Sequence, residues 1–321
     1  MRDNLPLTRR FFFLGALASS LACDRTRRSS SRTESLVSIR RAGSYQQDLD
    51  SIVRSILVEH RVPVRGKTIV IKPNLVEFAP GTPINTHPLF VASVQRALLA
   101  EGAAHVQVAE GPGHRRATFE MAESAGYFEA IPAFDGDFTD LNLDDVKLVR
   151  PARVFSTRLS ELYLPATILN ADLVVSLPKM KTHHWAGATL SMKNLFGIIP
   201  GAVYGWPKNL LHWAGIPQSI ATIHQLVPRQ FSIVDGIEAM EGNGPIVGRT
   251  KTMGVIVAGA NPIQVDSTCC RIMGINPERV EYLRLASTLH PPSAAHQIGE
   301  RIETVRNPFE LPRGFDDLRL S

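Results

Sequence analysis

The sequence predicts an α/β fold: a mostly parallel open sheet with helices on both faces and a site at the carboxyl ends of the strands. Short, continuously apolar runs such as Thr68–Ile71 and Leu173–Leu177 alternate with segments of helical periodicity, which is typical of parallel sheets. Five apolar runs are each followed by a polar turn that contains proline or glycine. The turns are KPN, EGPG, PKMKTHH, DGIE and AGANP. Ligands of open parallel sheets bind where such turns converge, so we expect the site there.

The remaining elements follow from the spacing of apolar residues along the chain. Helices are expected at residues 45–60, 89–101, 119–126, 216–227, 265–273 and 277–287. Further strands are expected at residues 106–109, 146–149, 231–234 and 254–258, and near Val154 and Ile302. The segment 199–216 is rich in Gly, Trp, Pro and His and is long for a connection, so it is predicted to be a lid or binding loop.

Charge separates the first 41 residues from the rest of the chain. The 321 residues are 44% hydrophobic, enough for a large core, and carry a formal charge of +5. Residues 1–41 contain nine Arg and three acidic residues, a net +6, which leaves −1 for the remainder. The basic excess therefore belongs to the leader, and a nucleic-acid-binding surface on the folded body is excluded as a function class.

The leader has the pattern of an export signal. Thr8-Arg9-Arg10 precedes three phenylalanines and resembles a twin-arginine motif, and the apolar run Phe11–Leu21 is too short to span a bilayer. We predict that residues 1–41 are a twin-arginine signal and a flexible Arg/Ser-rich tether, and that residues 42–321 form a single α/β domain. The export machinery would be a partner. The protein would be periplasmic, or membrane-anchored on the outer side of the inner membrane.

The three cysteines bear on lipidation, disulfides and metal binding. Cys23 is either the lipidated residue of an imperfect lipoprotein box or a neighbour of an ordinary cleavage site near Ala22. Cys269 and Cys270 are adjacent in sequence. Neither a disulfide framework nor a thiolate metal cluster is therefore encoded.

The stretch from Asp172 to Gly201 is the centre of the predicted site. It contains no carboxylate between its two ends, and it carries these polar side chains: Lys179, Lys181, Thr182, His183, His184, Lys193 and Asn194. A solvated loop normally mixes charges, so this pattern favours an anionic ligand; the alternative is a basic surface loop with one buried histidine.

Candidate residues fall into a cationic and an acidic group. The predicted catalytic residues are Lys179, Lys181, His183 and Asp235, with His183 preferred over His184 because adjacent residues diverge on a strand. The predicted substrate-binding residues, whose lysines and amides suit phosphate or carboxylate oxygens, are Lys72, Asn74, His87, Lys193, Asn194, Lys208 and His212.

The acidic group predicts a divalent metal. Its carboxylates suit Mg²⁺ or Ca²⁺, and the candidate ligands are Asp235, Glu238, Glu241 and Asp266. One histidine of the pair 183–184 with a carboxylate is a second arrangement, for Zn²⁺ or Fe²⁺. The alternatives are structural: Asp235 as a turn or helix cap, and Asp266 as a helix N-cap.

Several runs together resemble a known family. They are IKPNLV, Thr86-His87-Pro88, VAEG, LPKMKTHHWAGATLSMKNLFGIIPG, VDGIEAMEGNGP and VIVAGANPIQVDS. From Lys67 to Ala286 the chain resembles the domain of unknown function 362 (DUF362) family. The resemblance implies an α/β domain and supplies no reaction. Some relatives carry ferredoxin-type iron–sulfur segments; with three cysteines and no such spacing, no iron–sulfur cluster is expected here.

Two functions follow from these expectations. The first is an exported enzyme acting on a small phosphate- or carboxylate-bearing anion, as a hydrolase or isomerase that uses a divalent metal or acid–base side chains. The alternative is a non-catalytic protein that binds a ligand or handles a cofactor in the same pocket.

Overall fold

The computed structural model describes residues 35–113, 117–132, 134–227, 229–289 and 295–320. The twin-arginine motif and Cys23 lie outside these residues, so the export signal and the lipid anchor stay predictions. Within the described part of the chain, no helix has the length and apolar character needed to cross a membrane.

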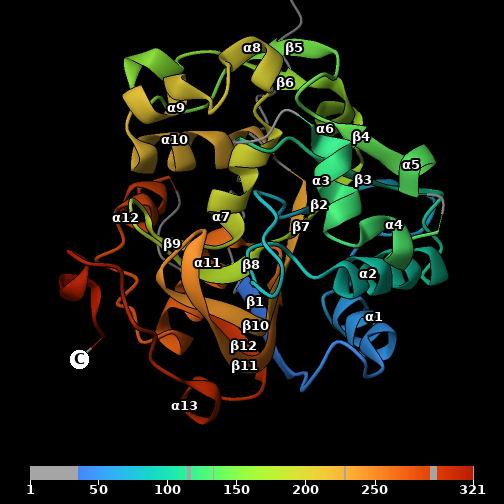
Figure 1. Ribbon diagram of the computed structural model, residues 1–321, viewed down its shortest axis with the longest axis vertical. Coiled ribbons are helices and arrows are strands. Elements are labelled where there is room, and N and C mark those ends of the chain that lie inside the picture. Colours follow the sequence, from blue (N-terminus) through green and yellow to red (C-terminus); the bar gives the residue numbers. More distant parts are fainter. Residues whose placement is uncertain (1–34, 114–116, 133, 228, 290–294, 321) are drawn as a thin grey trace, which may run out of the picture. The chain divides into compact units, whose positions relative to one another are not determined.

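A mixed, mostly parallel sheet forms the centre of the domain (Figure 1). Its main path runs through β12 (Ala295–Gly299), β1 (Ser35–Arg41), β11 (Val247–Gly259), β10 (Gln230–Asn243), β7 (Leu173–Leu177), β2 (Thr68–Pro73), β3 (His105–Glu110) and β4 (Phe138–Asp140). Only the pairings of β11 with β1 and with β10 are antiparallel along this path. The predicted fold class is confirmed.

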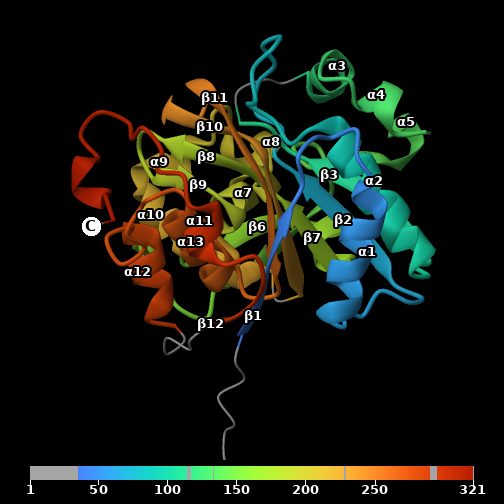
Figure 2. The same ribbon diagram turned by 90° about the horizontal axis from the view of Figure 1, so that it is seen from below.

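Helices cover both faces of the sheet (Figure 2). One face carries α1 (Leu49–Glu59), α2 (Pro88–Ala100), α3 (Thr118–Ser124), α4 (Tyr127–Ala130) and α5 (Phe134–Asp137). The other carries α7 (Ser191–Asn194), α10 (Ile216–Ile223), α11 (Pro262–Ile272), α12 (Glu281–Ser287) and α13 (Ile302–Val305). Alternation along β2 explains the two cores: Ile69 and Ile71 pack on the α1–α2 side, whereas Val70 packs on the opposite side.

A third apolar cluster lies beside Val70 and holds the segments that the sequence left least defined. It includes β5 (Val146–Val149), β6 (Leu162–Pro165), α6 (Ala166–Asn170), α8 (Gly201–Tyr204) and α9 (Asn209–Trp213). Short 3₁₀ helices occur at Thr157–Leu159, Leu195–Ile198, His224–Leu226 and Asp316–Leu318. Segment 199–216 therefore contains two short helices. The predictions of strands near Val154 and Ile302 are wrong. Val154 lies in no helix or strand, Ile302 begins α13, and the edge strand is β12.

The boundary expected at residue 41 is also wrong. Residues Ser35–Arg41 form β1, which pairs with β11 on one side and with β12 on the other. Val37 and Ile39 are fully buried beneath α11, while the arginines at the end of the strand reach outward. The alternation of a half-buried strand was hidden because the surrounding sequence is rich in Arg and Ser.

Two of the five predicted turns are not turns at the common edge. DGIE lies inside β10, where the ladder with β11 shifts register between Gly236 and Glu238, so its glycine marks a β-bulge. AGANP follows β11, which runs antiparallel to β10; Gly259 pairs with Ser232, near the beginning of β10. The carboxyl end of β11 therefore lies at the opposite edge of the sheet.

The turn PKMKTHH is a strand as well. After Pro178 the chain continues as β8 (Lys179–His183), which pairs with β10 and with β9 (Gly187–Thr189). Proline ends one ladder because it lacks an N–H, yet it does not prevent a second strand from starting at the next residue. All five residues of β8 are buried, so its lysines lie inside the protein instead of on a surface loop.

Candidate functional site

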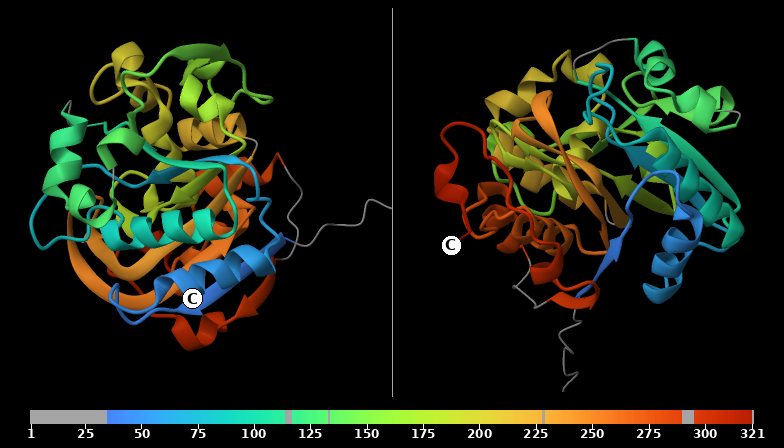
Figure 3. Two further views of the ribbon diagram at one scale, coloured as in Figure 1. Left: turned by 90° about the vertical axis from the view of Figure 1, so that its right-hand side faces the viewer. Right: turned by 60° about the horizontal axis from the view of Figure 1, so that its bottom comes forward.

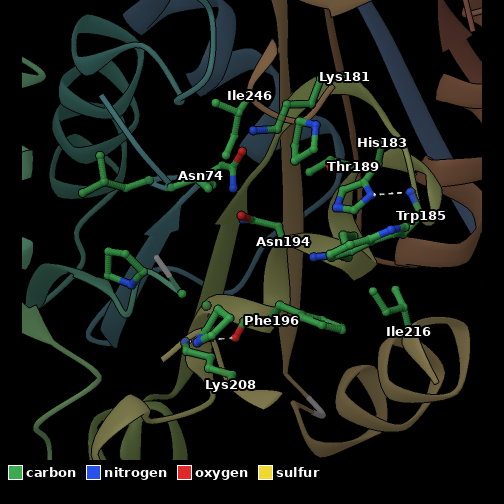
Figure 4. Close-up of a pocket in the computed structure, with 18 of the residues that line it drawn as sticks. Asn74, Lys181, His183, Trp185, Thr189, Asn194, Phe196, Lys208, Ile216 and Ile246 are labelled. Carbon is green, nitrogen blue, oxygen red and sulfur yellow. Dashed lines mark hydrogen bonds between the residues drawn. The ribbon is translucent and has the colours of Figure 1, made fainter. Parts of the chain in front are cut away.

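A cavity of about 370 Å³ lies beyond the carboxyl ends of β2 and β3 and against β8 (Figure 4). The turns KPN and EGPG contribute side chains to it, and so does β8. The hairpin of β10 and β11, which curves through the domain in Figure 3, closes one end with residues 243–247. The structure thus brings together three of the five segments that the sequence placed at one edge.

Four lysines line this cavity: Lys72, Lys181, Lys193 and Lys208. Lys72 forms a buried ion pair with Glu110 at 2.6 Å. Among the described residues, no carboxylate lies within ion-pair distance of the other three ammonium groups. We call Lys181, Lys193 and Lys208 the lysine triad. A cavity with three unpaired cationic side chains and one neutralised pair attracts anions.

The pKa values of the triad reflect the lack of a carboxylate partner among the described residues, since Nζ of Lys181, for example, donates only to the carbonyl of Ile84 (2.6 Å). Burial and, to a smaller extent, the nearby charge of Lys72 lower the pKa of Lys193 to about 7, against an opposing effect of Glu110. Burial also lowers the pKa of Lys208 to about 7, against an opposing effect of Glu110. The pKa of Lys181 lies well below its ordinary value, because of burial and the charges of Lys193 and Lys179. An anion in the cavity would favour the charged forms.

Lys208 is held by an unusual backbone conformation. It is the N-cap of α9 and has φ of +66°, in the left-handed region that non-glycine residues rarely adopt. Its Nζ donates hydrogen bonds to the carbonyl oxygens of Gly111 (2.5 Å) and Phe196 (3.4 Å). Such strain persists where the surroundings fix it, and it often marks a functional site. Here it directs a buried lysine to the floor of the cavity.

Lys193 is positioned by Asp266. The Asp266 carboxylate accepts hydrogen bonds from the N–H groups of Ser191 (2.7 Å) and Met192 (3.1 Å), so it caps α7, which carries Lys193. Burial raises the pKa of Asp266 to about 7. Nζ of Lys193 lies 3.8 Å from the ring centroid of Phe196. The N-cap alternative for Asp266 therefore describes its role, although the helix that it caps is not its own.

His183 is a neutral hydrogen-bond donor. Its Nδ1 accepts from the N–H groups of Trp185 (3.0 Å) and Ala186 (3.3 Å), so the ring proton sits on Nε2. Burial and the neighbouring lysines hold the pKa of His183 well below its usual value. His183 lines the cavity as expected, but His184 lines it too and the two rings stack at 5.1 Å, so the expectation that the adjacent side chains diverge is wrong. A neutral imidazole with a fixed tautomer can donate to an anion's oxygen.

Two further polar side chains at the cavity each have a buried oxygen that finds no hydrogen-bond partner within the described part of the chain. Asn74 is 6% exposed and Thr189 is 4% exposed. Among the described residues, Oδ1 of Asn74 and Oγ1 of Thr189 have no hydrogen-bond partner. Buried polar atoms are rarely left unpaired, and a water or a ligand in the cavity would supply the partners: a donor for Oδ1 of Asn74, and an acceptor or a donor for Oγ1 of Thr189. Figure 4 shows both residues at the cavity, on opposite sides.

Asn194 and the pair of Lys72 and Glu110 form the floor. Nδ2 of Asn194 donates to the carbonyl of Lys72 (3.1 Å) and to Oγ of Ser176 (3.0 Å), while its Oδ1 accepts from Nζ of Lys72 (3.3 Å). Glu110 also accepts from the N–H groups of Leu75 and Gly111. Lys72 and Asn194, both predicted to bind substrate, thus have their polar groups engaged within the protein.

The backbone at Gly197 packs directly against the Lys72–Glu110 pair, and we expect Gly197→Ala to disrupt this contact. A Cβ at Gly197 would overlap Oε1 of Glu110 and come within 2.5 Å of Nζ of Lys72. Overpacking of this kind costs about 1–3 kcal/mol of unfolding free energy. Urea denaturation measures the loss. Gly136→Ala is the control, because a Cβ there meets no atom within 4 Å. Equal stability of both variants would contradict the assignment.

Lys179, Asp235 and His87 lie outside the lining of the cavity. Nζ of Lys179 pairs with Asp235 at 2.6 Å, and Asp235 also accepts from the Tyr45 hydroxyl (2.8 Å) and from the N–H of His87 (3.0 Å). The rings of Tyr45 and His87 stack at 3.8 Å. Burial lowers the pKa of His87 to about 4. These four residues, which we call the Asp235 network, tie β8, β10, the α2 N-terminus and the segment before α1 together.

The predicted catalytic and binding sets are therefore divided. Lys181 and His183 of the catalytic set line the cavity, and Lys179 and Asp235 do not. The binding set is placed there with one exception, His87; the six residues present are Lys72, Asn74, Lys193, Asn194, Lys208 and His212. The sequence could not separate Lys179 from Lys181, because both stand on one short strand.

The four carboxylates expected to bind a metal are not assembled into one site. Asp235 and Asp266 belong to the separate contacts described above. Glu238 is exposed, and Glu241 pairs with Lys251 at 3.0 Å. In the described part of the chain, no group of three His, Cys, Asp or Glu side chains is suited to hold a metal. The physical reason is that the β10 bulge and its long hairpin separate residues that are close in sequence.

Sequence reasoning missed the residues that form the apolar side of the cavity. They are Trp185, Phe196, Ile216, Ile246 and Val247, together with Thr189 on the polar side. Apolar residues next to strands and helices are usually core, so only Trp185, directly after two histidines, carried a signal. Figure 4 shows Trp185, Phe196 and Ile216 on the side away from Asn74.

Comparison with known proteins finds one relative by sequence. The chain is 29% identical, over 223 residues, to the thylakoid-associated protein sll1697 of Synechocystis sp. (strain ATCC 27184 / PCC 6803 / Kazusa). The match covers 67% of this chain and 65% of that protein, so the chain spans less than two thirds of its relative's length.

Two solved structures are similar at lower identity. One is a protein from Thermotoga maritima solved in a structural genomics programme, with 15% identity and a TM-score of 0.44, covering 78% of this chain and 61% of that one. The other is the lactate racemase apoprotein from Thermoanaerobacterium thermosaccharolyticum, with 12% identity and a TM-score of 0.46, covering 74% and 57%. The family model for the domain of unknown function DUF362 matches residues 69–271. The chain belongs to the DUF362 family.

Proposed function

We propose that this protein is an enzyme that acts on a small organic anion bearing a phosphate or a carboxylate. The observation that carries the proposal is the lysine triad, three buried or partly buried ammonium groups without a carboxylate partner among the described residues, on one cavity. A bound anion stabilises the protonated form of such lysines, because it supplies the negative charge that no carboxylate of the described residues provides.

The roles of the side chains follow from their contacts. Lys208 holds the anionic group near Lys193, since both lysines contact Phe196. Figure 4 shows Lys181, His183 and Thr189 on the other side of the cavity, where they would bind a second polar group of the ligand. Lys193 is the acid–base group, since no hydrogen bond among the described residues fixes its Nζ and its pKa is about 7. A group with such a pKa accepts and returns protons near neutral pH, where general acid–base catalysis is most effective.

Lysine-to-methionine variants of the full chain test this proposal. Methionine keeps an unbranched apolar side chain and removes the charge. Calorimetric titration with phosphate, sulfate and malonate should show affinities about 10–100-fold lower for Lys193→Met and for Lys208→Met, which corresponds to losing one charge-assisted hydrogen bond or ion contact. Lys147→Met, on the exposed surface of β5, is the matched control and should bind as the unchanged protein does.

Turnover separates the enzyme from the binding-protein alternative. In a screen of phosphate esters and carboxylic acids, Lys193→Met should lower the rate at least about 100-fold, the usual contribution of a general acid or base. An anion that binds through the triad and is never converted would instead support the non-catalytic protein. Anion affinities that are the same in all three variants would overturn the site itself.

A further inference from the structure

We propose that the ligand of this site is an amphipathic aromatic anion, whose anionic group lies at Lys208 and Lys193 of the lysine triad and whose planar apolar body extends along the wall toward Trp185. This inference rests on the proposed function and deepens it by naming the class of ligand. Its basis is the contrast between the inside and the mouth of the cavity: lysines without a carboxylate partner among the described residues line the inside, and large apolar side chains line the mouth.

The cavity is too large for an inorganic anion. Its volume of about 370 Å³ equals that of roughly a dozen water molecules, each occupying about 30 Å³ in the liquid. A phosphate or carboxylate group at the triad would leave most of this space unfilled. Cavities of this size bind organic molecules, and their walls are mostly apolar with a few polar groups that fix the orientation.

The wall opposite Asn74 is apolar and aromatic (Figure 4). Phe196 lies beside Lys193, and the indole of Trp185 lies above the start of α10 with Ile216. The hairpin residues Ile246 and Val247 also line the cavity, and Figure 4 draws Ile246 on the same side as Asn74. These side chains come from four separate segments, and the fold brings them to the same cavity that holds the triad.

The mouth of the cavity leaves large apolar side chains uncovered. Trp185 is 57% exposed and Val247 is 79% exposed. The edge of the Trp185 indole meets the rings of His184 and His212, with centroid distances of 4.5 and 5.4 Å. Exposed tryptophans gather at ligand sites because one ring supplies a large apolar contact area together with a polar N–H.

A second hollow continues the cavity outward. It is lined by Trp185, Pro207, Asn209, His212, Ile216 and Pro217. Four of these residues also line the inner cavity, so the two spaces share the wall around Trp185. A ligand anchored at the triad and longer than the inner cavity would reach this outer part. Flat rings and proline faces favour a planar aromatic body over a flexible chain.

Paired probes of equal charge test the inference on the full-length protein. We would measure by calorimetric titration the affinities of two pairs of anions, methyl phosphate with phenyl phosphate and acetate with benzoate, and also that of hexyl phosphate. In each pair the aromatic anion should bind at least about tenfold more tightly than the small one, because it buries its ring against the apolar wall. Hexyl phosphate should gain less than phenyl phosphate.

Two tryptophan variants locate the effect. Trp185→Ala should reduce the affinity for phenyl phosphate about tenfold and leave that for methyl phosphate unchanged. Trp213→Ala is the matched control: Trp213 is 67% exposed on the neighbouring α9 and lines neither hollow, so both affinities should stay constant. Thermal unfolding of both variants verifies that they are folded.

The outcomes distinguish the two proposals. If Lys208→Met weakens methyl phosphate binding while the aromatic probes gain nothing, the anion site stands and the aromatic inference is overturned. Hexyl phosphate binding as tightly as phenyl phosphate also overturns it, in favour of an apolar chain. If neither small anion responds to Lys208→Met, the proposed function itself fails. An aromatic gain that Trp185→Ala abolishes and Trp213→Ala preserves supports the inference.

Discussion

Asp235→Asn is expected to lower the free energy of unfolding by about 3–5 kcal/mol, the usual loss when one partner of a buried ion pair is removed. Lys179 would remain buried with its ammonium group 2.6 Å from a neutral amide. The hydrogen bonds from Tyr45 and His87 would lose a charged acceptor as well. Urea denaturation of the full chain, followed by far-ultraviolet circular dichroism, measures the change.

Two further variants make this prediction decisive. Glu238→Gln, on the same strand and exposed, should alter the stability by less than about 0.5 kcal/mol. If Asp235→Asn does not fold, the double variant Lys179→Met/Asp235→Leu should recover much of the stability, since an apolar pair replaces an ion pair without leaving a lone charge. Unchanged stability of Asp235→Asn together with lost turnover would return Asp235 to the catalytic set.

Anion affinity is expected to fall as the pH rises from 6 to 9. The pKa values of Lys193 and Lys208 are about 7 in the free protein, lowered by burial from their ordinary value. Below these pKa values both lysines carry a charge and an anion binds without proton uptake. Above them each lysine must take up a proton when the anion binds, so affinity falls by up to about tenfold per pH unit for each lysine.

Sulfate is the suitable probe, because its own charge is constant over this range. Calorimetric titration in two buffers of different ionisation enthalpy should report proton uptake per sulfate that increases from pH 6 to pH 9 by up to two protons, one each for Lys193 and Lys208. Lys208→Met should bind more weakly at pH 6 and show an increase of at most one proton over the same range. An affinity that does not change with pH would mean that the triad is not the binding site.

The residues of the triad illustrate what the sequence could and could not predict. Lys181 and Lys193 stand in a stretch without carboxylates, and that absence of negative charge was visible in the sequence. Lys208 was visible only as one polar residue in a segment rich in Gly, Trp and Pro. Its left-handed backbone and its contact with Gly111, nearly a hundred residues away in the chain, depend on tertiary packing.

The acidic residues show the opposite case. Asp235, Glu238 and Glu241 are spaced closely enough to resemble a metal site, and a strand ending at residue 234 would have placed them on one loop. The strand instead continues through a bulge to Asn243, because β11 folds back and pairs with its whole length. A long-range hairpin thus decides the environment of each carboxylate, and no local pattern reports it.

By itself the sequence determined the class of fold, the core strands Leu173–Leu177 and Thr68–Ile71, and the concentration of cations around residues 179–194. Local apolar periodicity and the local absence of carboxylates are sufficient for these. Tertiary structure alone decided that Lys72 is neutralised by Glu110, that Lys179 is neutralised by Asp235, and that the triad remains unpaired. The reason is that a charge's partner is set by distance in space, and each of these partners is contributed by a different strand.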